Sequence, residues 1–404
     1  MIPRARWILD RELRLRQEGR AASRRGKRDL GEVLLMPGLV NTHCHLDYTT
    51  LRGRIPRAPN FARWIEALGR AKAPWRAADY REAILEGLRE ALAFGTTAML
   101  NWICLPEALP AAGAPPMRVW WLWEQIAYRP DAKADRESWD AWRREVRARR
   151  ALWRGGVAPH APYTCAREVV RAAARWSARA RTPWSLHVAE SSDEWRMFRE
   201  ARGALYDFMR RVGRPLSDCD GRTPLAAVWD EIAVSRAPAV LTHANCLDRA
   251  DVKRLGAAAR RGVSLAVAHC PRSTRTLGHP AFPLRALRQA GVPVALGTDS
   301  LASNDDLSMF AEMRAFADAH PARHPREIVA MATLDAAKAL GAGAAWKRWK
   351  DWIAIPCSAT RPSGVWDVLL AHQGPVAWAM VDGREVDLET LKRRAPCAAP
   401  EPAA

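Results

Sequence analysis

The feature of this sequence that most restricts its fold is a regular alternation of short apolar runs with longer segments of helical periodicity. Eight apolar runs occur, at residues 33–43, 96–103, 117–126, 155–160, 184–190, 239–246, 262–270 and 291–299. Segments of helical pattern lie between and after them, and include residues 79–94, 135–152, 166–180, 193–203, 248–261, 284–289 and 305–319. Eight buried strands, each followed by a helix, predict an α/β protein built on a (β/α)8 TIM barrel, whose catalytic groups would lie at the carboxyl ends of the strands.

The two ends of the chain fall outside this alternation. Residues 352–356, 365–372 and 376–381 are predicted as short strands, and the last of them enters an Asp382-Gly383 turn suited to a tight hairpin. We therefore expect a small β-sandwich built from the N- and C-terminal segments, residues 1–35 and 345–394, beside a catalytic barrel over residues 36–344. Residues 395–404 (APCAAPEPAA, from Ala395) are expected to be disordered.

Composition limits the classes of protein that this chain can represent. The N-terminal residues are interrupted by charges and do not resemble a signal peptide, and no apolar stretch is long enough for a membrane span. Eight cysteines without a C-x-x-C pair indicate reduced thiols, so we expect a cytoplasmic protein. The net charge of +19 is spread over the predicted helices, which favours a solvated basic surface over a nucleic-acid partner.

The first predicted strand of the barrel ends in NTHCHLD, which contains two histidines at a spacing of two residues. Since side chains alternate across a strand, His43 and His45 should point to the same side and Cys44 to the other. Two neutral imidazoles on one face can bind a borderline-soft metal such as zinc.

Three further predicted strands end in residues that suit a metal site. His187 and Glu190 end the fifth strand, and Glu190 should lie just past the strand because three residues separate them. Asp299 ends the eighth strand, where Ser303, Asn304 and Asp305 could cap the next helix and leave Asp299 free for the metal. His243, at the end of the sixth strand, is placed to act as a second acid or base beside Glu190.

The motifs PGLVNTHCHLD, HAPYTC, LHVAES, LTHANC, HCPRS and LGTDSLASN together resemble the amidohydrolase superfamily, in its mononuclear aminohydrolase branch. The resemblance covers about residues 34–341 and is closest to aminodeoxyfutalosine deaminases and methylthioadenosine or S-adenosylhomocysteine deaminases. It implies that His43, His45, His187 and Asp299 bind zinc or iron, zinc being favoured. The bridging lysine on strand four of binuclear members is missing from GGVAPH, so one metal ion is expected.

The same resemblance implies a hydrolytic deaminase that releases ammonia from an aminated heterocycle, with an adenine-type nucleoside derivative as the expected substrate. Glu190, His243 and Asp299 would transfer protons, and His160 would contact the substrate together with Tyr48, Trp64 and Ser303. A chlorohydrolase, an amidase-like enzyme and a noncatalytic metal-binding barrel are the alternatives, and a homodimer is compatible with the sequence. His269 is expected to be structural or to support the metal ligands, and His279, His320, His324 and His372 are expected to lie on the surface or in packing positions.

Overall fold

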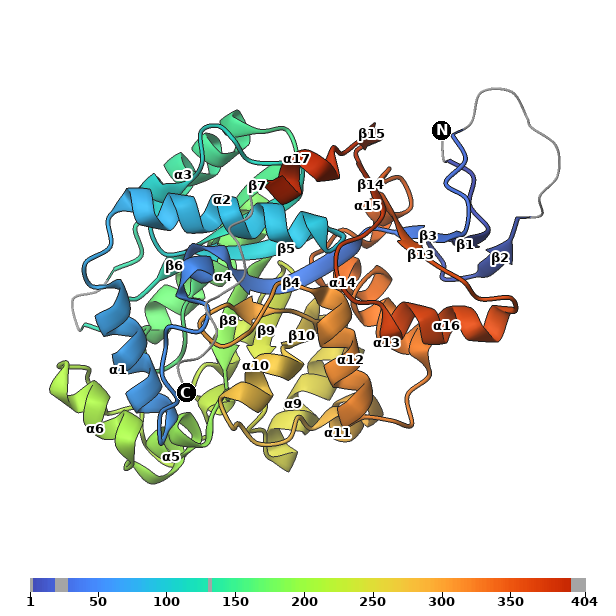
Figure 1. The fold of residues 1–404 in the computed structure, drawn as a ribbon. Coiled ribbons are helices and arrows are strands. Elements are labelled where there is room, and N and C mark those ends of the chain that lie inside the picture. Colours follow the sequence, from blue (N-terminus) through green and yellow to red (C-terminus); the bar gives the residue numbers. More distant parts are fainter. Residues whose placement is uncertain (1–2, 19–27, 130–132, 394–404) are drawn as a thin grey trace.

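The alternation of strand and helix expected from the sequence is seen in a computed structural model that describes residues 3–18, 28–129 and 133–393 (Figure 1). The expected disordered tail at residues 395–404 lies outside the described residues. Two parallel sheets form the centre of the molecule, with strand orders β12-β4-β5-β6-β7 and β8-β9-β10-β11. Their strands are β4 (Leu39–His45), β5 (Thr96–Ile103), β6 (Arg118–Gln125), β7 (Trp153–Pro159), β8 (Trp184–Val188), β9 (Ala239–His243), β10 (Leu265–His269), β11 (Val294–Leu296) and β12 (Asp299–Ser300).

Backbone hydrogen bonds connect these two sheets at both of their edges. The amide of His187 in β8 donates to the carbonyl of His160, directly after β7, at 2.9 Å. On the other side, the amide of Thr298 donates to the carbonyl of His43 in β4 at 3.1 Å. The carboxyl ends of the parallel strands therefore lie near one another, and the predicted site residues are at or just beyond those ends.

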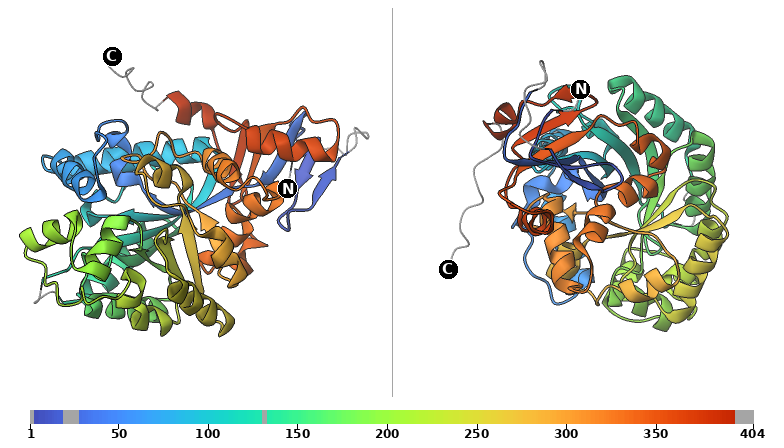
Figure 2. Two further views of the ribbon diagram at one scale, coloured as in Figure 1. Left: turned by 90° about the horizontal axis from the view of Figure 1, so that it is seen from below. Right: turned by 90° about the vertical axis from the view of Figure 1, so that its right-hand side faces the viewer.

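Helices cover the outside of the strands in the views of Figures 1 and 2. Those of the strand-helix alternation are α2 (Ala77–Ala93), α3 (Arg136–Arg149), α4 (Arg167–Ala180), α5 (Ser192–Glu200), α9 (Arg249–Arg260), α11 (Leu284–Gln289) and α12 (Met309–Ala319). Additional helices are α1 (Phe61–Lys72), α6 (Ala204–Arg211), α7 (Pro224–Ala227), α8 (Trp229–Ala233), α10 (Pro271–Thr276), α13 (Pro325–Met331), α14 (Leu334–Ala339), α15 (Gly343–Trp346) and α17 (Leu388–Arg393), with 3-10 turns η1 (Leu46–Leu51) and η2 (Pro106–Ala108). None of the helices in the described part of the chain combines the length and the hydropathy that crossing a membrane requires.

Segments from both ends of the chain do share a sheet, as expected, and it has six strands in the order β15-β14-β13-β3-β1-β2. The strands are β1 (Trp7–Leu9), β2 (Leu15–Gln17), β3 (Val33–Pro37), β13 (Trp352–Pro356), β14 (Trp378–Val381) and β15 (Arg384–Glu385). The described residues form one terminal sheet and not the two facing sheets of a sandwich. β3 runs directly into β4, so this sheet lies at the end of the molecule where the central strands begin.

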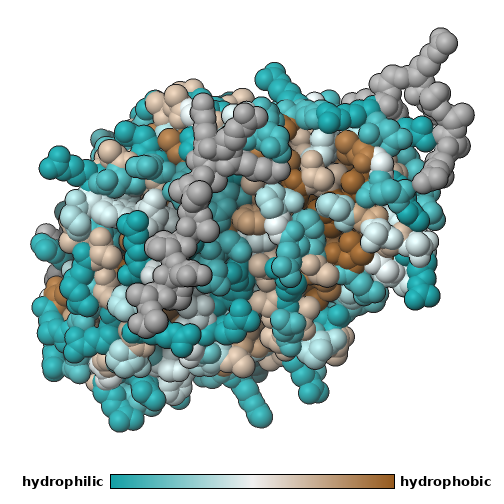
Figure 3. All heavy atoms as spheres, in the orientation of Figure 1, coloured by the Kyte–Doolittle hydropathy of each residue, from teal (hydrophilic) through white to brown (hydrophobic). Residues whose placement is uncertain are grey.

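The strand predicted at residues 365–372 is wrong, because this segment belongs to helix α16 (Pro362–Ala371). Its apolar run has no clean period of two, and Pro362 stands in the first helical turn, where its missing N–H costs nothing. Val365 and Leu369 are four residues apart and are both buried, as expected for one face of a helix. In Figure 3 most of the visible surface is hydrophilic, and hydrophobic residues gather on the side that carries the terminal sheet and α16.

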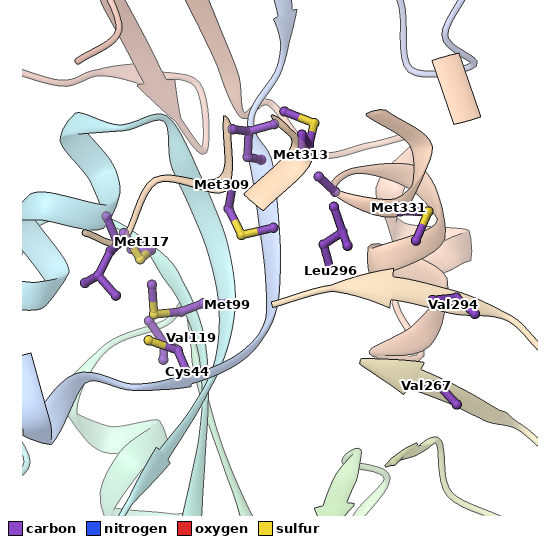
Figure 4. Packing of buried hydrophobic residues seen from close by; sticks show 14 of the residues in the cluster. Cys44, Met99, Met117, Val119, Val267, Val294, Leu296, Met309, Met313 and Met331 are labelled. Carbon is purple, nitrogen blue, oxygen red and sulfur yellow. The ribbon is translucent and has the colours of Figure 1, made fainter. Parts of the chain in front are cut away.

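Sulfur-containing side chains fill part of the core between the strands and their covering helices. Figure 4 shows Cys44, Met99, Met117, Met309 and Met313 in this layer, together with apolar residues of the same core cluster. Flexible methionine side chains can fill irregular spaces between elements. Cys44 therefore points into the apolar core, as the alternation along β4 predicted, while His43 and His45 point the other way. The seven cysteines in the described residues are all free thiols.

Gly297, between β11 and β12, is a position where the packing tolerates no side chain. A Cβ atom there would lie 2.9 Å from the backbone N and O atoms of His43. We predict that Gly297→Ala lowers the free energy of unfolding by about 2 kcal/mol or more, since overpacking typically costs ~1–3 kcal/mol. In contrast, a Cβ atom at Gly364 in α16 would contact only Ala359 Cβ, at 3.6 Å. Gly364→Ala should therefore raise the free energy of unfolding by about 0.5–1 kcal/mol. Urea unfolding followed by circular dichroism tests both, and equal effects would contradict the close approach of the two strands.

Candidate metal centre and active site

Four buried side chains bring potential ligand atoms together at the carboxyl ends of the central strands. The Nε2 atom of His187 lies 3.1 Å from Nε2 of His43 and 3.4 Å from Nε2 of His45. Asp299 Oδ1 lies 3.4 Å from Nε2 of His43 and 3.9 Å from Nε2 of His45. Zinc bonds of about 2.0–2.1 Å in a tetrahedral site separate neighbouring ligand atoms by roughly 3.3 Å. The potential ligand atoms fall into two overlapping groups of three, His43 with His45 and His187, and His43 with His243 and Asp299, and within each group they lie within 4.8 Å of one another. By spacing and donor type these side chains could hold a divalent metal.

The ionisation of these groups also suits a metal. Burial lowers the pKa of His45 and of His187 well below the ordinary value, so both imidazoles are neutral and keep a free lone pair. Burial alone would raise the pKa of Asp299, but the hydrogen bond to His43 and the nearby charges of the histidines outweigh it and lower that pKa. His45 and His187 thus offer neutral nitrogens and Asp299 a carboxylate, which are the forms that bind metal ions.

Left-handed backbone conformations occur where three of these strands end. Ala189, His243 and Asp299 have φ angles of 53°, 71° and 59°, a region that non-glycine residues rarely adopt. Each of them stands at or next to a predicted site residue, and strain of this kind is found at functional sites when the surrounding structure enforces it. The strand direction changes at these residues, so the side chains do not follow the simple alternation of a strand.

Asp299 is held by two serine hydroxyls that lie behind it. Ser273 Oγ donates to Asp299 Oδ2 at 2.6 Å, and Ser303 Oγ donates to the same oxygen at 3.0 Å. Ser303 was expected to contact the substrate, but the structure places it outside the residues that line the cavity, with 1% of its surface exposed. The expected cap of the next helix by residues 303–305 is wrong, because α12 begins later and Ser308 accepts the hydrogen bond from Ala311 N–H.

Glu190 lies beside the metal-ligand cluster, between two histidines. Its Oε1 atom is 3.6 Å from Nε2 of His243 and 3.3 Å from Nε2 of His279. Two hydrogen bonds hold its backbone. The N–H of Glu190 donates to the side-chain carboxylate of Glu194 at 2.7 Å, and its carbonyl accepts from the side-chain amide of Asn245 at 3.0 Å. Burial raises the pKa of Glu190, but the charges of His243 and His279 outweigh this and lower it overall. Glu190 is therefore a carboxylate that can accept a proton.

His279 was expected to be a surface or packing residue, but the structure brings its buried side chain to Glu190. It lies on the loop between α10 and α11, and nothing in its sequence neighbourhood indicated a partner. By comparison, His269 at the end of β10 stacks on Phe282 with ring centroids 3.9 Å apart and does not belong to the metal-ligand cluster. The ring of His372 contacts Phe310, which agrees with a packing role.

A cavity of about 250 Å³ opens onto this cluster, and polar side chains line its inner part. His160 is held by Thr164 Oγ1 at 2.7 Å from its Nδ1, and burial lowers its pKa to about 4, so it is neutral. Tyr48 stacks on His45 and accepts a hydrogen bond from Lys72 Nζ at 2.7 Å. The sequence patterns did not indicate Glu124, a buried carboxylate at the end of β6 that lines the cavity 3.9 Å from His160 Nε2.

The outer part of the cavity is apolar and is formed by two helices. Helix α1 contributes Phe61, Trp64, Ile65 and Leu68, and α6 contributes Phe208 and Met209, followed by Val212. Trp64, an expected substrate contact, therefore lies in this wall and stacks on Phe61 at 5.8 Å. From the sequence, Trp102 could belong either to the cavity wall or to the core. The structure buries it fully, with its ring centroid 4.2 Å from that of His187, and it does not line the cavity.

Comparison with known proteins places this chain in a family. The sequence profile of the Amidohydrolase family matches residues 34–344. The 5-methylthioadenosine/S-adenosylhomocysteine deaminase of Nitratidesulfovibrio vulgaris is 32% identical over 328 residues, covering 78% of this chain and 67% of the relative. The enzyme of the same name from Pyrococcus furiosus is 27% identical over 325 residues, covering 78% and 72%. The chain belongs to the Amidohydrolase family, which confirms the resemblance seen in its motifs.

Solved structures show the same fold at lower sequence identity. Helicobacter pylori aminofutalosine deaminase in complex with methylthio-coformycin has a TM-score of 0.80 at 17% identity, covering 95% of this chain and 99% of that one. An adenosine deaminase from Xanthomonas campestris with bound zinc has a TM-score of 0.75 at 22% identity, covering 98% of both chains. Atrazine chlorohydrolase of Arthrobacter aurescens with zinc has a TM-score of 0.77 at 18% identity, covering 97% and 98%. Together with the histidine and aspartate cluster, these zinc-containing structures support a divalent metal here.

The ligand set predicts how metal content responds to mutation. We expect His187→Ala to lose most of the metal found in the wild-type protein, because one of the candidate ligand atoms is removed, whereas His320→Gln, away from the cluster, should retain it. Chelation should lower the melting temperature and zinc should restore it, since metal at 100 times its Kd adds about 2.7 kcal/mol to stability. Elemental analysis and thermal melts test this, and wild-type metal content in His187→Ala would contradict the assignment.

The buried Glu194 predicts a pH-dependent stability. Burial raises its pKa from 4.5 to about 8, so the folded state binds its proton more tightly than the unfolded state. This contribution is fully favourable below pH 4.5 and is lost as the pH rises toward 8. Relative to Glu194→Gln, the wild-type protein should therefore become less stable between pH 5 and 8, as measured by urea unfolding. Glu168→Gln, an exposed change on α4, is the control, and a pH-independent difference for Glu194→Gln would refute the prediction.

Proposed function

We propose that this chain is a hydrolytic deaminase with one zinc ion held by His43, His45, His187 and Asp299 in a closed (β/α)8 barrel. The observation that carries the proposal is that two overlapping groups of potential ligands, one with His45 and His187 and one with Asp299, share His43 at the base of a cavity that Glu190 and His243 also line. The hydrogen bonds between the two central sheets at both edges support the closed barrel. Residues 36–344 would form this barrel, and residues 1–35 and 345–394 the terminal sheet domain.

The zinc ion, when bound, would lower the pKa of a water molecule toward about 7 and so supply a nucleophile at neutral pH. Glu190 is a carboxylate and can accept a proton from this water, with Asp299 as a second acceptor within the cluster. Glu190 would then deliver a proton to a ring nitrogen of the substrate as the water oxygen adds to the amine-bearing carbon. His243, at 3.6 Å from Glu190, would orient and polarise the attacking water.

The reaction is complete when the carbon–nitrogen bond breaks. A second proton, passed through Glu190, would reach the exocyclic amine, which leaves as ammonia, and the water oxygen remains on the ring as a carbonyl. Near the proposed metal the cavity wall is buried, since His187 and Glu190 are each 5% exposed, and poor solvation strengthens these electrostatic interactions. The balance is one water consumed and one ammonia released for each substrate, with no redox partner.

An adenine-type nucleoside derivative is the substrate class that we propose. The relatives named methylthioadenosine or S-adenosylhomocysteine deaminase, and the aminofutalosine and adenosine deaminases of the same fold, support it. The inner wall offers hydrogen-bonding groups from His160, Glu124 and Tyr48, and the outer wall from α1 and α6 suits an apolar substituent. We propose no nucleic-acid or membrane partner, and a homodimer stays a prediction.

We predict that Glu190→Gln lowers kcat for ammonia release by about 100-fold or more, because the amide cannot carry the proton. The metal content should not change, and Glu82→Gln, an exposed change on α2, should behave as the wild-type protein does. The assay is ammonia release by zinc-loaded protein from aminodeoxyfutalosine, methylthioadenosine, S-adenosylhomocysteine, adenosine and guanine. Activity on none of these would refute the purine-deaminase proposal, and chloride release from a chlorotriazine would favour the chlorohydrolase alternative.

A further inference from the structure

A second hollow lies at the other end of the central strands, where they begin. Its volume is about 630 Å³, and its lining comes from β6, β7 and the segments that lead into β8 and β9, with parts of α3, α4 and α15. The strands of five to eight residues separate it from the catalytic cavity by roughly 15–25 Å at about 3.3 Å per residue. The right-hand view of Figure 2 faces this end of the molecule, which also carries the terminal sheet. We call it the basic hollow.

Positive charge dominates the basic hollow. Six arginines line it, and its lining contains no aspartate or glutamate; the arginines are Arg118, Arg143, Arg147, Arg154, Arg181 and Arg236. They come from six different positions along about 120 residues, so the fold and not a local run of sequence gathers them. Like charges at one concave surface repel one another, and a concave, low-dielectric wall concentrates their field.

Most of these arginines have no acidic partner among the described residues. Arg118 pairs with Asp351 at 2.6 Å and with Asp382 at 2.7 Å, but no ion pair is formed by the other five. Elsewhere on the surface some arginines pair with nearby carboxylates, as Arg63 does with Glu66 and Arg149 does with Glu145, and others are solvated singly. The guanidinium of Arg154 donates to the backbone carbonyls of Ala151 and Trp153, at 2.6 and 2.8 Å. Four guanidinium groups around the hollow therefore have no hydrogen bond or ion pair with a described residue, those of Arg143, Arg147, Arg181 and Arg236. Burial, and then the charges of Arg147 and Arg118, lower the pKa of Arg154, which is the expected result of such crowding.

A polar side chain in the wall adds an independent observation. Thr182, which precedes β8, is 4% exposed and lines the basic hollow. Its hydroxyl is buried and has no hydrogen-bond partner among the described residues. A buried hydroxyl without a partner costs free energy. The hollow therefore combines unpaired guanidinium groups with an unsatisfied hydroxyl donor.

We propose that the basic hollow binds a small anion that carries two or more phosphate groups. Guanidinium groups bind phosphate oxygens through pairs of parallel hydrogen bonds, and several of them around one concavity match several phosphates at once. A single phosphate would leave most of the arginines unpaired. The concave shape and limited volume favour a small polyanion over an extended nucleic-acid strand. This site is separate from the deaminase chemistry and does not depend on it.

Isothermal titration calorimetry with tripolyphosphate, in a buffer without phosphate at 50 mM salt, tests the proposal. We expect one tripolyphosphate per chain and weaker binding of orthophosphate. The double variant Arg147→Gln and Arg236→Gln should weaken tripolyphosphate binding at least tenfold. The matched control, Arg249→Gln with Arg285→Gln, removes the same charge from exposed positions on α9 and α11 and should change the affinity less than twofold.

Three results would overturn the proposal. One is the absence of tripolyphosphate binding by the wild-type protein, and another is equal weakening in both double variants, which would show a response to net charge alone. The third is tighter binding of a single-stranded RNA oligonucleotide than of tripolyphosphate, which would reassign the surface to nucleic acid. Ammonia release by the double variant should match the wild-type rate, so failure of this proposal and failure of the deaminase proposal are distinguishable.

Discussion

The site depends on the close approach of the segment between β11 and β12 to strand β4. Gly297 lies against the backbone of His43, and the amide of Thr298 donates to the carbonyl of His43. This approach sets Asp299 beside the two histidines of β4, which come from the opposite end of the sequence. A larger residue at position 297 would push the two strands apart, and the carboxylate would lose contact with the imidazoles. The proposed set of metal ligands therefore depends first on the packing of these two backbone segments.

The surroundings shift the pKa values of two neighbouring carboxyl groups in opposite directions. Glu190 faces His243 and His279, and its pKa is lowered, whereas Glu194 is buried four residues further along the chain, and its pKa is raised to about 8. One glutamate is thus prepared for proton transfer, and the other accepts the N–H of Glu190 and fixes its backbone. Asp299 receives a similar support from Ser273 and Ser303. The groups proposed to react are held by neighbours that do not touch the cavity.

Most of the fold and the centre of the site could be predicted because they follow local patterns. The period of two placed His43 and His45 on one face and Cys44 on the other, and strand ends marked His187 and Asp299. The segment at residues 365–372 was misassigned because a short apolar run fits a strand and a helix equally well, and Pro362 decided in favour of the helix. Ser303 was predicted as a substrate contact, but the turn after β12 directs it behind Asp299.

By itself, the sequence determined the alternation of strands and helices in the central part of the chain and the family, and it indicated four candidate metal ligands, since these depend on periodicity and on motifs along the chain. Only the tertiary structure decided that His279 meets Glu190, that Glu124 lines the cavity, and that arginines from six positions surround one hollow. Those contacts join residues that are tens of residues apart, and no local pattern records which strand ends or loops the folded chain brings together.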